Sequence, residues 1–166
     1  MRQLTYRIAA LVVILPIAAA SDTSLIDRIA GYYSAPARLC TEFDGEKYVP
    51  CNHPYRDCLK LKKLDSTHAY FNVSSVQQNG AVCGMEGIAK IDHNTLEYVD
   101  HDSTDPMAYG AKLIIRVTND AITFESIAGA SAAGQDPFCG RQGQMRWVKF
   151  FLKDRRPFDS GKCNVP

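Results

Sequence analysis

The sequence has no apolar run long enough to cross a bilayer. Its longest run, residues 8–20, is interrupted by Pro16 and has 13 residues, whereas a membrane helix needs about 20. Arg2 and Arg7 precede this run, and three alanines end it at Ala20. Such an arrangement is typical of a secretory signal peptide. We therefore predict a signal peptide over residues 1–20, cleaved near Ala20. Residues 21–166 are predicted to form one domain, periplasmic or secreted, without a membrane span.

The chain also has no excess of charge of either sign. The chain carries 19 basic and 18 acidic side chains, and removing Arg2 and Arg7 leaves 17 basic against 18 acidic. A domain so close to neutrality is not typical of a nucleic-acid-binding protein or of a polybasic protein that coats a membrane surface. We therefore expect no nucleic-acid partner.

The cysteines show no close pair of the CxxC type, which argues against a zinc site. An even number of cysteines in an exported chain predicts disulfides. The six are Cys40, Cys51, Cys58, Cys83, Cys139 and Cys163. They allow 15 full pairings. The pairing we favour is Cys83 with Cys139, which would join two strands of a sheet. The other four would staple the N-terminal loops and the C-terminal tail.

Hydrophobic residues recur with a period of two from Cys58 onward. Leu59 and Leu61 alternate with lysines, and Leu113 and Ile115 alternate in the same way, with an Asn-Gly turn signal at residues 79–80. The result is roughly seven or eight short strands whose links leave no room for crossover helices. We predict an all-β, antiparallel, up-and-down barrel or meander, or a sandwich, stapled by disulfides.

Three segments lie outside this rhythm. Residues 24–30 form an apolar stripe typical of a short helix, with Ser24 and Asp27 as a weak capping box. Residues 41–57 are rich in Pro, Asp, Gly and Cys, and are predicted to be a stapled loop. Residues 157–166 are predicted to be a C-terminal tail.

Two further stretches are predicted to carry a binding site. Residues 99–111 are acidic and contain a proline, and residues 128–137 are small and flexible. Long loops on a stiff sheet commonly hold binding residues. Arg141 follows Cys139 within a Gly140–Gly143 frame, so a disulfide would make it a pre-organised anchor. The simpler interpretation is a tight bulge with a solvated arginine. The partner-binding candidates are Ser131, Gln135, Asp136, Asp100, Asp102, Gly140, Arg141 and Gly143.

No catalytic set is evident in the sequence. The four histidines are scattered, and the stretch from Gly129 ends in Ala133 where a nucleophile elbow needs glycine. A divalent ion held by Asp92, Asp100, Asp102 and Asp105 is one interpretation, and a solvated acidic loop is the simpler one. We predict no enzyme, no cofactor and no metal.

The C-terminal stretch is basic, in contrast to the acidic loop. It contains Arg146, Lys149, Lys153, Arg155, Arg156 and Lys162 against Asp154 and Asp159. Polyanion binding is one interpretation. The simpler interpretation is that these residues form the solvent-exposed face of the last strand.

The opening Gly31-x-Tyr33 after a short helix resembles the start of calycin-type barrels, where a Gly-x-Trp closes the barrel base. The resemblance implies a late arginine packed over the aromatic ring, with Arg146 or Arg155 as candidates. The eight-strand, cysteine-stapled plan also resembles small bacterial periplasmic lysozyme inhibitors. This likeness is architectural and spans roughly residues 24–155, because the motifs of that family are not intact here.

That resemblance implies a function, with two alternatives left open. The chain would be an exported binding protein that inhibits an extracellular or cell-wall hydrolase, such as lysozyme, by inserting a loop into its active-site cleft. One alternative is a calycin-like carrier of a small apolar ligand, with a lumen lined by Phe71, Met85, Ile115 and Phe124. The other is a small secreted metal-dependent hydrolase.

Overall fold

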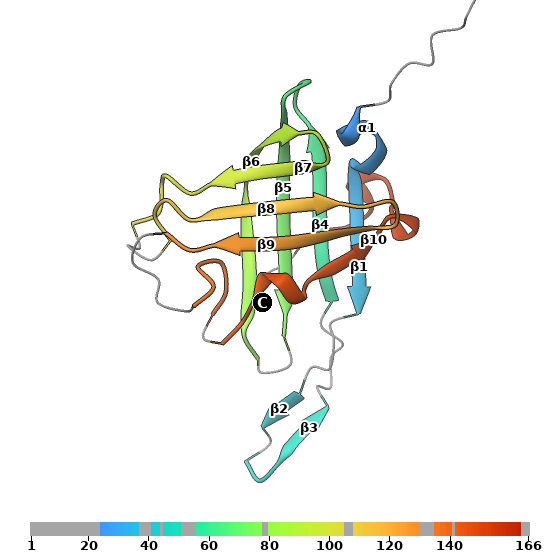
Figure 1. The fold of residues 1–166 in the computed structure, drawn as a ribbon. Coiled ribbons are helices and arrows are strands. Elements are labelled where there is room, and N and C mark those ends of the chain that lie inside the picture. Colours follow the sequence, from blue (N-terminus) through green and yellow to red (C-terminus); the bar gives the residue numbers. More distant parts are fainter. Residues whose placement is uncertain are drawn as a thin grey trace, which may run out of the picture.

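The fold is an all-β barrel with one short helix, as the sequence predicts (Figure 1). The computed structural model describes residues 24–36, 41–43, 45–50, 56–77, 80–104, 108–129, 135–140 and 142–163. The predicted signal peptide, residues 1–20, lies outside them. In the described part of the chain, no helix is both long and apolar enough to span a membrane.

Eight strands form one antiparallel sheet in the order β1-β4-β5-β6-β7-β8-β9-β10. Their bounds are Gly31–Pro36 for β1, Arg56–Lys63 for β4, His68–Val76 for β5, Val82–Asp92 for β6, Thr95–Val99 for β7, Lys112–Val117 for β8, Ala121–Ile127 for β9 and Lys149–Phe151 for β10. Helix α1, Leu25–Ile29, precedes them, and short 3₁₀ turns lie at Met145–Trp147 (η1), Leu152–Asp154 (η2) and Phe158–Ser160 (η3).

The sheet curls until its two ends nearly meet. Strands β7, β8 and β9 pass across β1, β4 and β5, so that the inner faces of the two layers pack together (Figure 1). Just after β10, Arg156 exchanges two backbone hydrogen bonds of 2.9 Å with Tyr32 of β1. The first strand and the end of the sequence therefore meet at the seam of the barrel.

The interior is filled by the apolar positions of the period-two pattern. Leu59, Leu61, Phe71 and Ile115 are fully buried. The Phe71 ring lies edge-on to Tyr98, with centroids 5.3 Å apart. Burying each such side chain contributes roughly 1.5–3 kcal/mol, so these residues supply much of the stability of the barrel.

One end of the barrel is closed by α1. Tyr33 is fully buried, and its hydroxyl donates a 2.7 Å hydrogen bond to the carbonyl of Ile29. The Arg155 guanidinium donates to the carbonyls of Asp27 and Arg28 at the end of α1. A Cβ on Gly31 would lie 2.9 Å from the Arg155 side chain. Of the two late arginines considered, Arg155 is thus the one that packs at this end.

The predicted loop over residues 41–57 is wrong in part. Residues Thr41–Phe43 (β2) and Tyr48–Pro50 (β3) form an antiparallel hairpin of their own, drawn below the barrel in Figure 1. Gly45, with φ of 103°, lies in the turn between them. Aromatic and β-branched residues on both sides of this glycine outweigh the turn-forming composition. Strand β4 also begins at Arg56, inside the predicted loop.

The favoured disulfide, Cys83–Cys139, is confirmed. Cys83 belongs to β6, whereas Cys139 lies in an isolated β-bridge rather than in a full strand. The backbone N–H of Gly140 donates to Val82, and that of Gly84 donates to Phe138, at 2.8 and 3.0 Å. Residues 138–140 therefore extend the sheet beyond the edge of β6.

A second disulfide, Cys58–Cys163, fastens the tail to β4. Lys60 donates a 3.0 Å hydrogen bond to the carbonyl of Gly161, and its ammonium lies 4.2 Å from the Phe158 ring centroid. A Cβ on Gly161 would lie 2.6 Å from the Tyr32 ring, so glycine allows the tail to lie close against β1. Cys40 and Cys51 lie outside the described residues.

Candidate functional site

Those predicted binding residues that the structure describes lie at one end of the barrel, on the left in Figure 1 and away from α1. We call this region the loop end. It comprises the described parts of the loop 100–111, which joins β7 to β8, and of the segment 136–145, which leads from β9 toward β10. Gln135 directly precedes this segment and is counted with it. Arg141 belongs to the segment by sequence, and both Ser131 and Arg141 lie outside the described residues.

Asp100 organises the acidic loop from within. It is 5% exposed, and its carboxylate accepts hydrogen bonds from the backbone N–H groups of Asp102 (3.2 Å) and Ser103 (3.0 Å). Its own backbone pairs with Ala111 and Gly110. Asp102, by contrast, is exposed. Of these two predicted acids, the structure therefore places only Asp102 where a partner has access to the side chain.

Asp136 braces the second segment. Its carboxylate accepts hydrogen bonds from the Ser126 hydroxyl (2.5 Å) and from the backbone N–H groups of Met145 (2.7 Å) and Phe138 (3.1 Å). Bonds to a charged acceptor are stronger than neutral ones. The carboxylate thus joins both ends of the segment to β9. Its oxygens already accept these three hydrogen bonds, so it acts as a structural group.

Gly143 packs directly on the disulfide. It is buried, and a Cβ there would lie 2.9 Å from Cys139 Cβ and 3.1 Å from Cys83 Sγ. Its N–H donates to the carbonyl of Gly140 at 2.9 Å, which closes a turn over residues 140–143. Gln142 in this turn has φ of 65°, a left-handed conformation uncommon for a residue with a side chain. Gly140 and Gln142 are exposed.

Gln77 also holds the segment 136–145, although the sequence gives no sign of this role. Its side chain is 7% exposed. The amide donates to the carbonyl of Gln144 (2.6 Å) and accepts from the N–H of Gln144 (2.9 Å). A glutamine after a strand is ordinarily solvated, so nothing local in the sequence reveals this pairing.

Tyr98 lies between the two parts of the loop end. Its ring centroid is 6.5 Å from that of Phe138, and a Cβ on Gly87 would lie 2.5 Å from its ring. Burial raises the pKa of the Tyr98 phenol, and the nearby carboxylates of Asp100 and Asp102 raise it further. The acidic loop and the braced segment therefore share one aromatic contact.

The exposed rim of the loop end combines aromatic and polar groups. Tyr109 is 58% exposed, and its ring lies 6.4 Å from that of the exposed His101. Asp102, Gln135 and Gly140 are also exposed. The structure thus separates the predicted site into an outer rim and the bracing residues Asp100, Asp136 and Gly143.

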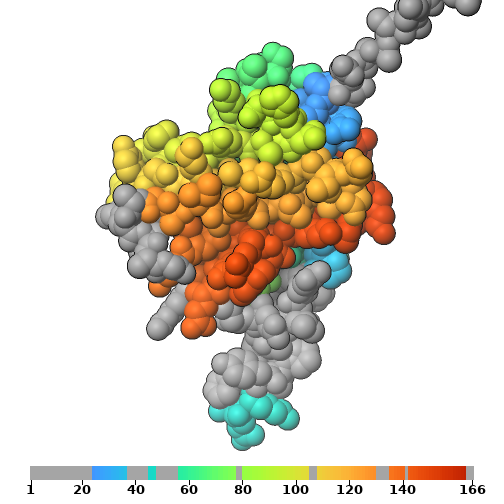
Figure 2. Space-filling model, in the orientation of Figure 1, coloured from blue at the N-terminus to red at the C-terminus, as the bar shows by residue number. Residues whose placement is uncertain are grey.

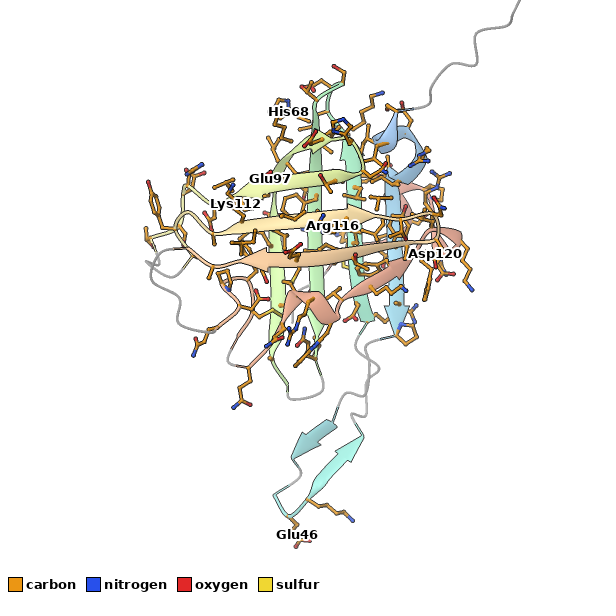
Figure 3. All side chains as sticks on the ribbon, in the orientation of Figure 1. Glu46, His68, Glu97, Lys112, Arg116 and Asp120 are labelled. Carbon is orange, nitrogen blue, oxygen red and sulfur yellow. A yellow bond between two sulfur atoms is a disulfide. The ribbon has the colours of Figure 1, made fainter. Side chains whose placement is uncertain are left out.

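Four charged side chains on the sheet face formed by β7, β8 and β9 pair with one another. Glu97, Lys112 and Arg116 lie on the strands that face the viewer in Figure 3. Lys112 pairs with Glu97 at 2.9 Å, and Arg116 pairs with Glu125 at 2.5 Å. These ion pairs bridge neighbouring strands, which indicates a solvated sheet face rather than a binding site.

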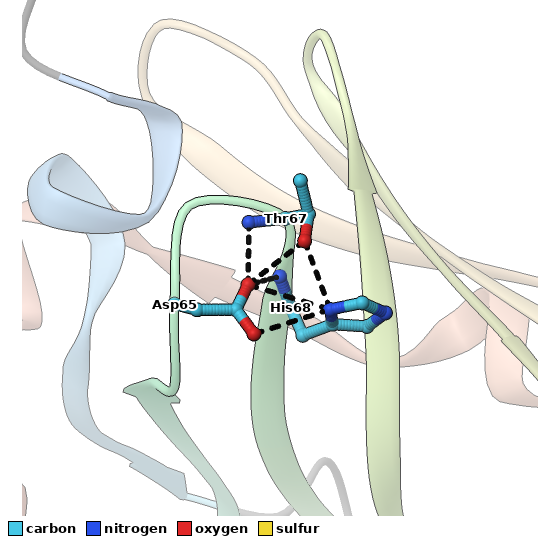
Figure 4. A network of polar contacts seen from close by, with 3 residues as sticks. All are labelled: Asp65, Thr67 and His68. Atoms are coloured by element: carbon cyan, nitrogen blue, oxygen red, sulfur yellow. Dashed lines mark hydrogen bonds and ion pairs between the residues drawn. The ribbon is translucent and has the colours of Figure 1, made fainter.

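His68 belongs to a turn network rather than to the loop end (Figure 4). Asp65 accepts hydrogen bonds from the backbone N–H groups of Thr67 (2.6 Å) and His68 (2.8 Å). The N–H of Thr67 is the main reason that the pKa of Asp65 falls to about 2, well below its ordinary value. This network shapes the connection between β4 and β5.

The acids considered for a divalent ion are not brought together. Asp92 and Asp100 flank β7 at its opposite ends, and Asp105 lies outside the described residues. Among the residues that the structure places, no three or more His, Cys, Asp or Glu side chains are arranged to hold a metal.

The residues considered for a ligand lumen lie in the core. Phe71 and Ile115 are fully buried, Phe124 is 4% exposed and Met85 is half-buried. A side chain with no accessible surface cannot line a space that admits even water. Phe71 and Ile115 therefore line no such space.

Comparison of the chain with protein-family models, curated proteins and solved structures found no match.

Proposed function

We propose that this chain is an exported binding protein that inhibits an extracellular or cell-wall hydrolase such as lysozyme. The turn 140–143 enters the active-site cleft, and Arg141 makes the central contact. The observation that carries the proposal is the bracing of the segment 136–145. The Cys83–Cys139 disulfide ties it to β6, the Asp136 carboxylate ties it to Ser126 of β9, and the amide of Gln77, which follows β5, holds Gln144.

Bracing favours binding because ordering a loop costs free energy. Each rotamer-rich side chain immobilised at an interface costs about 0.5–1.5 kcal/mol. This segment is already held by a disulfide and by five hydrogen bonds in which the Asp136 and Gln77 side chains take part, four as acceptors and one as donor. Much of the ordering cost is therefore met before a partner binds. The left-handed Gln142 adds a fixed backbone shape to the exposed turn. Pre-organised loops of this kind are typical of tight enzyme inhibitors.

The electrostatics of the rim favour a cationic partner. Asp102 is exposed at the loop end, and the stretch from residue 91 to residue 111 contains no lysine or arginine. Complementary charge raises the rate of encounter more than the final affinity. A basic hydrolase would therefore approach this end of the barrel faster than a neutral one.

The two alternatives have less support. A carrier of an apolar ligand needs interior space, whereas Phe71 and Ile115 have no accessible surface. A metal-dependent hydrolase needs its acids together, whereas Asp92 and Asp100 flank a strand.

The test uses the protein without its predicted signal peptide and with its disulfides intact. We expect it to capture one hydrolase from the native envelope and medium, and to reduce that hydrolase's activity at stoichiometric amounts. Arg141→Ala should weaken inhibition by tenfold or more, since central arginines are common hot spots of about 2 kcal/mol. The matched control is Arg28→Ala, an exposed arginine on α1, which should inhibit like the original.

Two results would overturn the proposal. One is the absence of any captured or inhibited hydrolase across a panel of lysozymes and other cell-wall hydrolases. The other is equal inhibition by the Arg141 and Arg28 variants, which would show that the turn is not the contact.

A further inference from the structure

The segment from η1 through β10 exposes aromatic rings on one side only. Val148 and Phe150 are each 1% exposed, whereas Trp147 and Phe151 are 52% and 40% exposed. Lys149, between them, is exposed as well. The backbone of residues 148–151 is extended, so alternate side chains share a face. Lys149 and Phe151 therefore share the outer face of β10, and Trp147, the last residue of η1, is exposed just before them.

The exposed surface of this segment is positively charged. The ammonium groups of Lys149 and Lys153 lie 4.8 and 5.5 Å from the Phe151 ring centroid. The cross-strand partners in β9, Thr123 opposite Lys149 and Ala121 opposite Phe151, bring no acid. We call Trp147, Lys149, Phe151 and Lys153 the aromatic–lysine stripe.

Neighbouring charges leave the stripe basic. Arg146, next to Trp147, is exposed and adds a third cation. Two acids lie beside the stripe. Asp154 is the one acid within the run 146–154, and the exposed Asp120 accepts the backbone N–H of Leu152 at its carbonyl. Glu125 on β9 is already paired with Arg116 at 2.5 Å, so the three cations outnumber these two acids. The near-neutral total charge of the chain therefore conceals a local excess of cations. Figure 2 shows the face of the molecule where this run (orange to red) borders β9.

We propose that the aromatic–lysine stripe docks the protein peripherally on an anionic lipid surface. Tryptophan and phenylalanine rings are favoured at the boundary between headgroups and acyl chains, and lysine stems extend so that their ammonium groups meet lipid phosphates. Anionic headgroups attract each such cation. Two exposed rings, at Trp147 and Phe151, accompany the lysines of the stripe. Apolar rings beside several cations match a surface that offers both acyl chains and phosphates better than they match a single acidic side chain.

The experiment takes advantage of Trp147, which is the only tryptophan in the sequence. Its fluorescence reports on the stripe without a label. The protein, again without its predicted signal peptide, is mixed with vesicles of phosphatidylcholine alone or of phosphatidylcholine with phosphatidylglycerol. We expect a blue shift and co-sedimentation with the anionic vesicles only. Added salt should reverse both, because it screens the lysines.

Two double variants of equal charge change provide the comparison. K149Q/K153Q removes both ammonium groups of the stripe and should lower the partition coefficient by more than tenfold, at about fivefold for each cation. K62Q/K90Q removes two exposed lysines from β4 and β6 and should bind like the original. Both variants keep Trp147 as the reporter.

Three outcomes would overturn the proposal. The first is neither a shift nor co-sedimentation with anionic vesicles. The second is equal loss of binding in the two double variants. The third is a shift with soluble polyglutamate but not with vesicles, which would identify an acidic protein surface as the partner. The inhibition assay with purified hydrolases contains no lipid, so its outcome is independent of these results.

Discussion

Two glycines of the loop end allow the bracing of the turn 140–143 to be tested by matched substitutions. A Cβ at Gly143 would lie 2.9 Å from Cys139 Cβ, 3.0 Å from Ala81 Cβ and 3.1 Å from Cys83 Sγ. A Cβ at Gly140 would find its nearest neighbour, the carbonyl oxygen of Val82, at 3.6 Å. Neither glycine has a left-handed φ. The two substitutions to alanine therefore differ in packing and not in backbone strain.

The expected magnitudes follow from these distances. An inserted methyl group in a packed region costs about 1–3 kcal/mol, and each glycine-to-alanine change gains about 0.4–1 kcal/mol by restricting the unfolded chain. Gly143→Ala should therefore lower the free energy of unfolding by about 1–2 kcal/mol. Gly140→Ala should leave it unchanged or raise it by up to about 1 kcal/mol. The separation between the two variants is about 2 kcal/mol, a factor of about 30 in the folding equilibrium.

Denaturant unfolding followed by Trp147 fluorescence measures this separation. The same preparations are then compared in the hydrolase assay, where Gly143→Ala should weaken inhibition because the displaced turn no longer fits the cleft. If the two variants unfold at the same denaturant concentration, the segment shifts to accommodate the added methyl group without loss of stability. The argument from a rigid turn would then be wrong.

Two further predictions concern the end of the barrel that α1 closes, and the remaining cysteines. Burial raises the pKa of Tyr33 to about 12, so the free energy of unfolding should fall as the pH rises from about 10 to 12, where the unfolded state loses the proton first. Tyr33→Phe should cost about 1 kcal/mol at neutral pH through the lost hydrogen bond to Ile29 and should flatten that alkaline decline; an unchanged slope in pH-dependent unfolding would contradict this. The two disulfides among the described residues use four of the six cysteines, and the other two, Cys40 and Cys51, flank the Thr41–Pro50 pair of the hairpin in the sequence. Peptide mapping without reduction should find them joined, and a free thiol at either would refute the pairing.

The barrel was predictable because alternation is a local signal. Leu59, Leu61, Leu113 and Ile115 are all fully buried, as their period-two spacing predicts. A strand places every second residue on the same face, so the buried positions can be predicted without knowing which strands pair with it. The hairpin over residues 41–50 was missed because its strands are too short for alternation to stand out against the glycine and proline around them.

The division of labour at the loop end was not predictable. Asp136 and Asp102 look alike in the sequence, yet one accepts three hydrogen bonds and the other is exposed. The difference depends on Ser126 and Met145, which the fold brings to Asp136 from ten and nine residues away. Gln77 is a stronger case, because its partner Gln144 is 67 residues distant. Contacts of this kind exist only after the barrel has closed.

The seam between Tyr32 and Arg156 also has a consequence for biosynthesis. The contact joins residues near the two extremes of the chain, and the Cys58–Cys163 bond spans 105 residues. Contacts between such distant residues form slowly, because the intervening chain must first be ordered. A growing polypeptide cannot complete this barrel until residue 156 has been synthesised and released from the ribosome. Up to that moment the seam stays open, and the backbone N–H and C=O groups of Tyr32 lack their partners in Arg156.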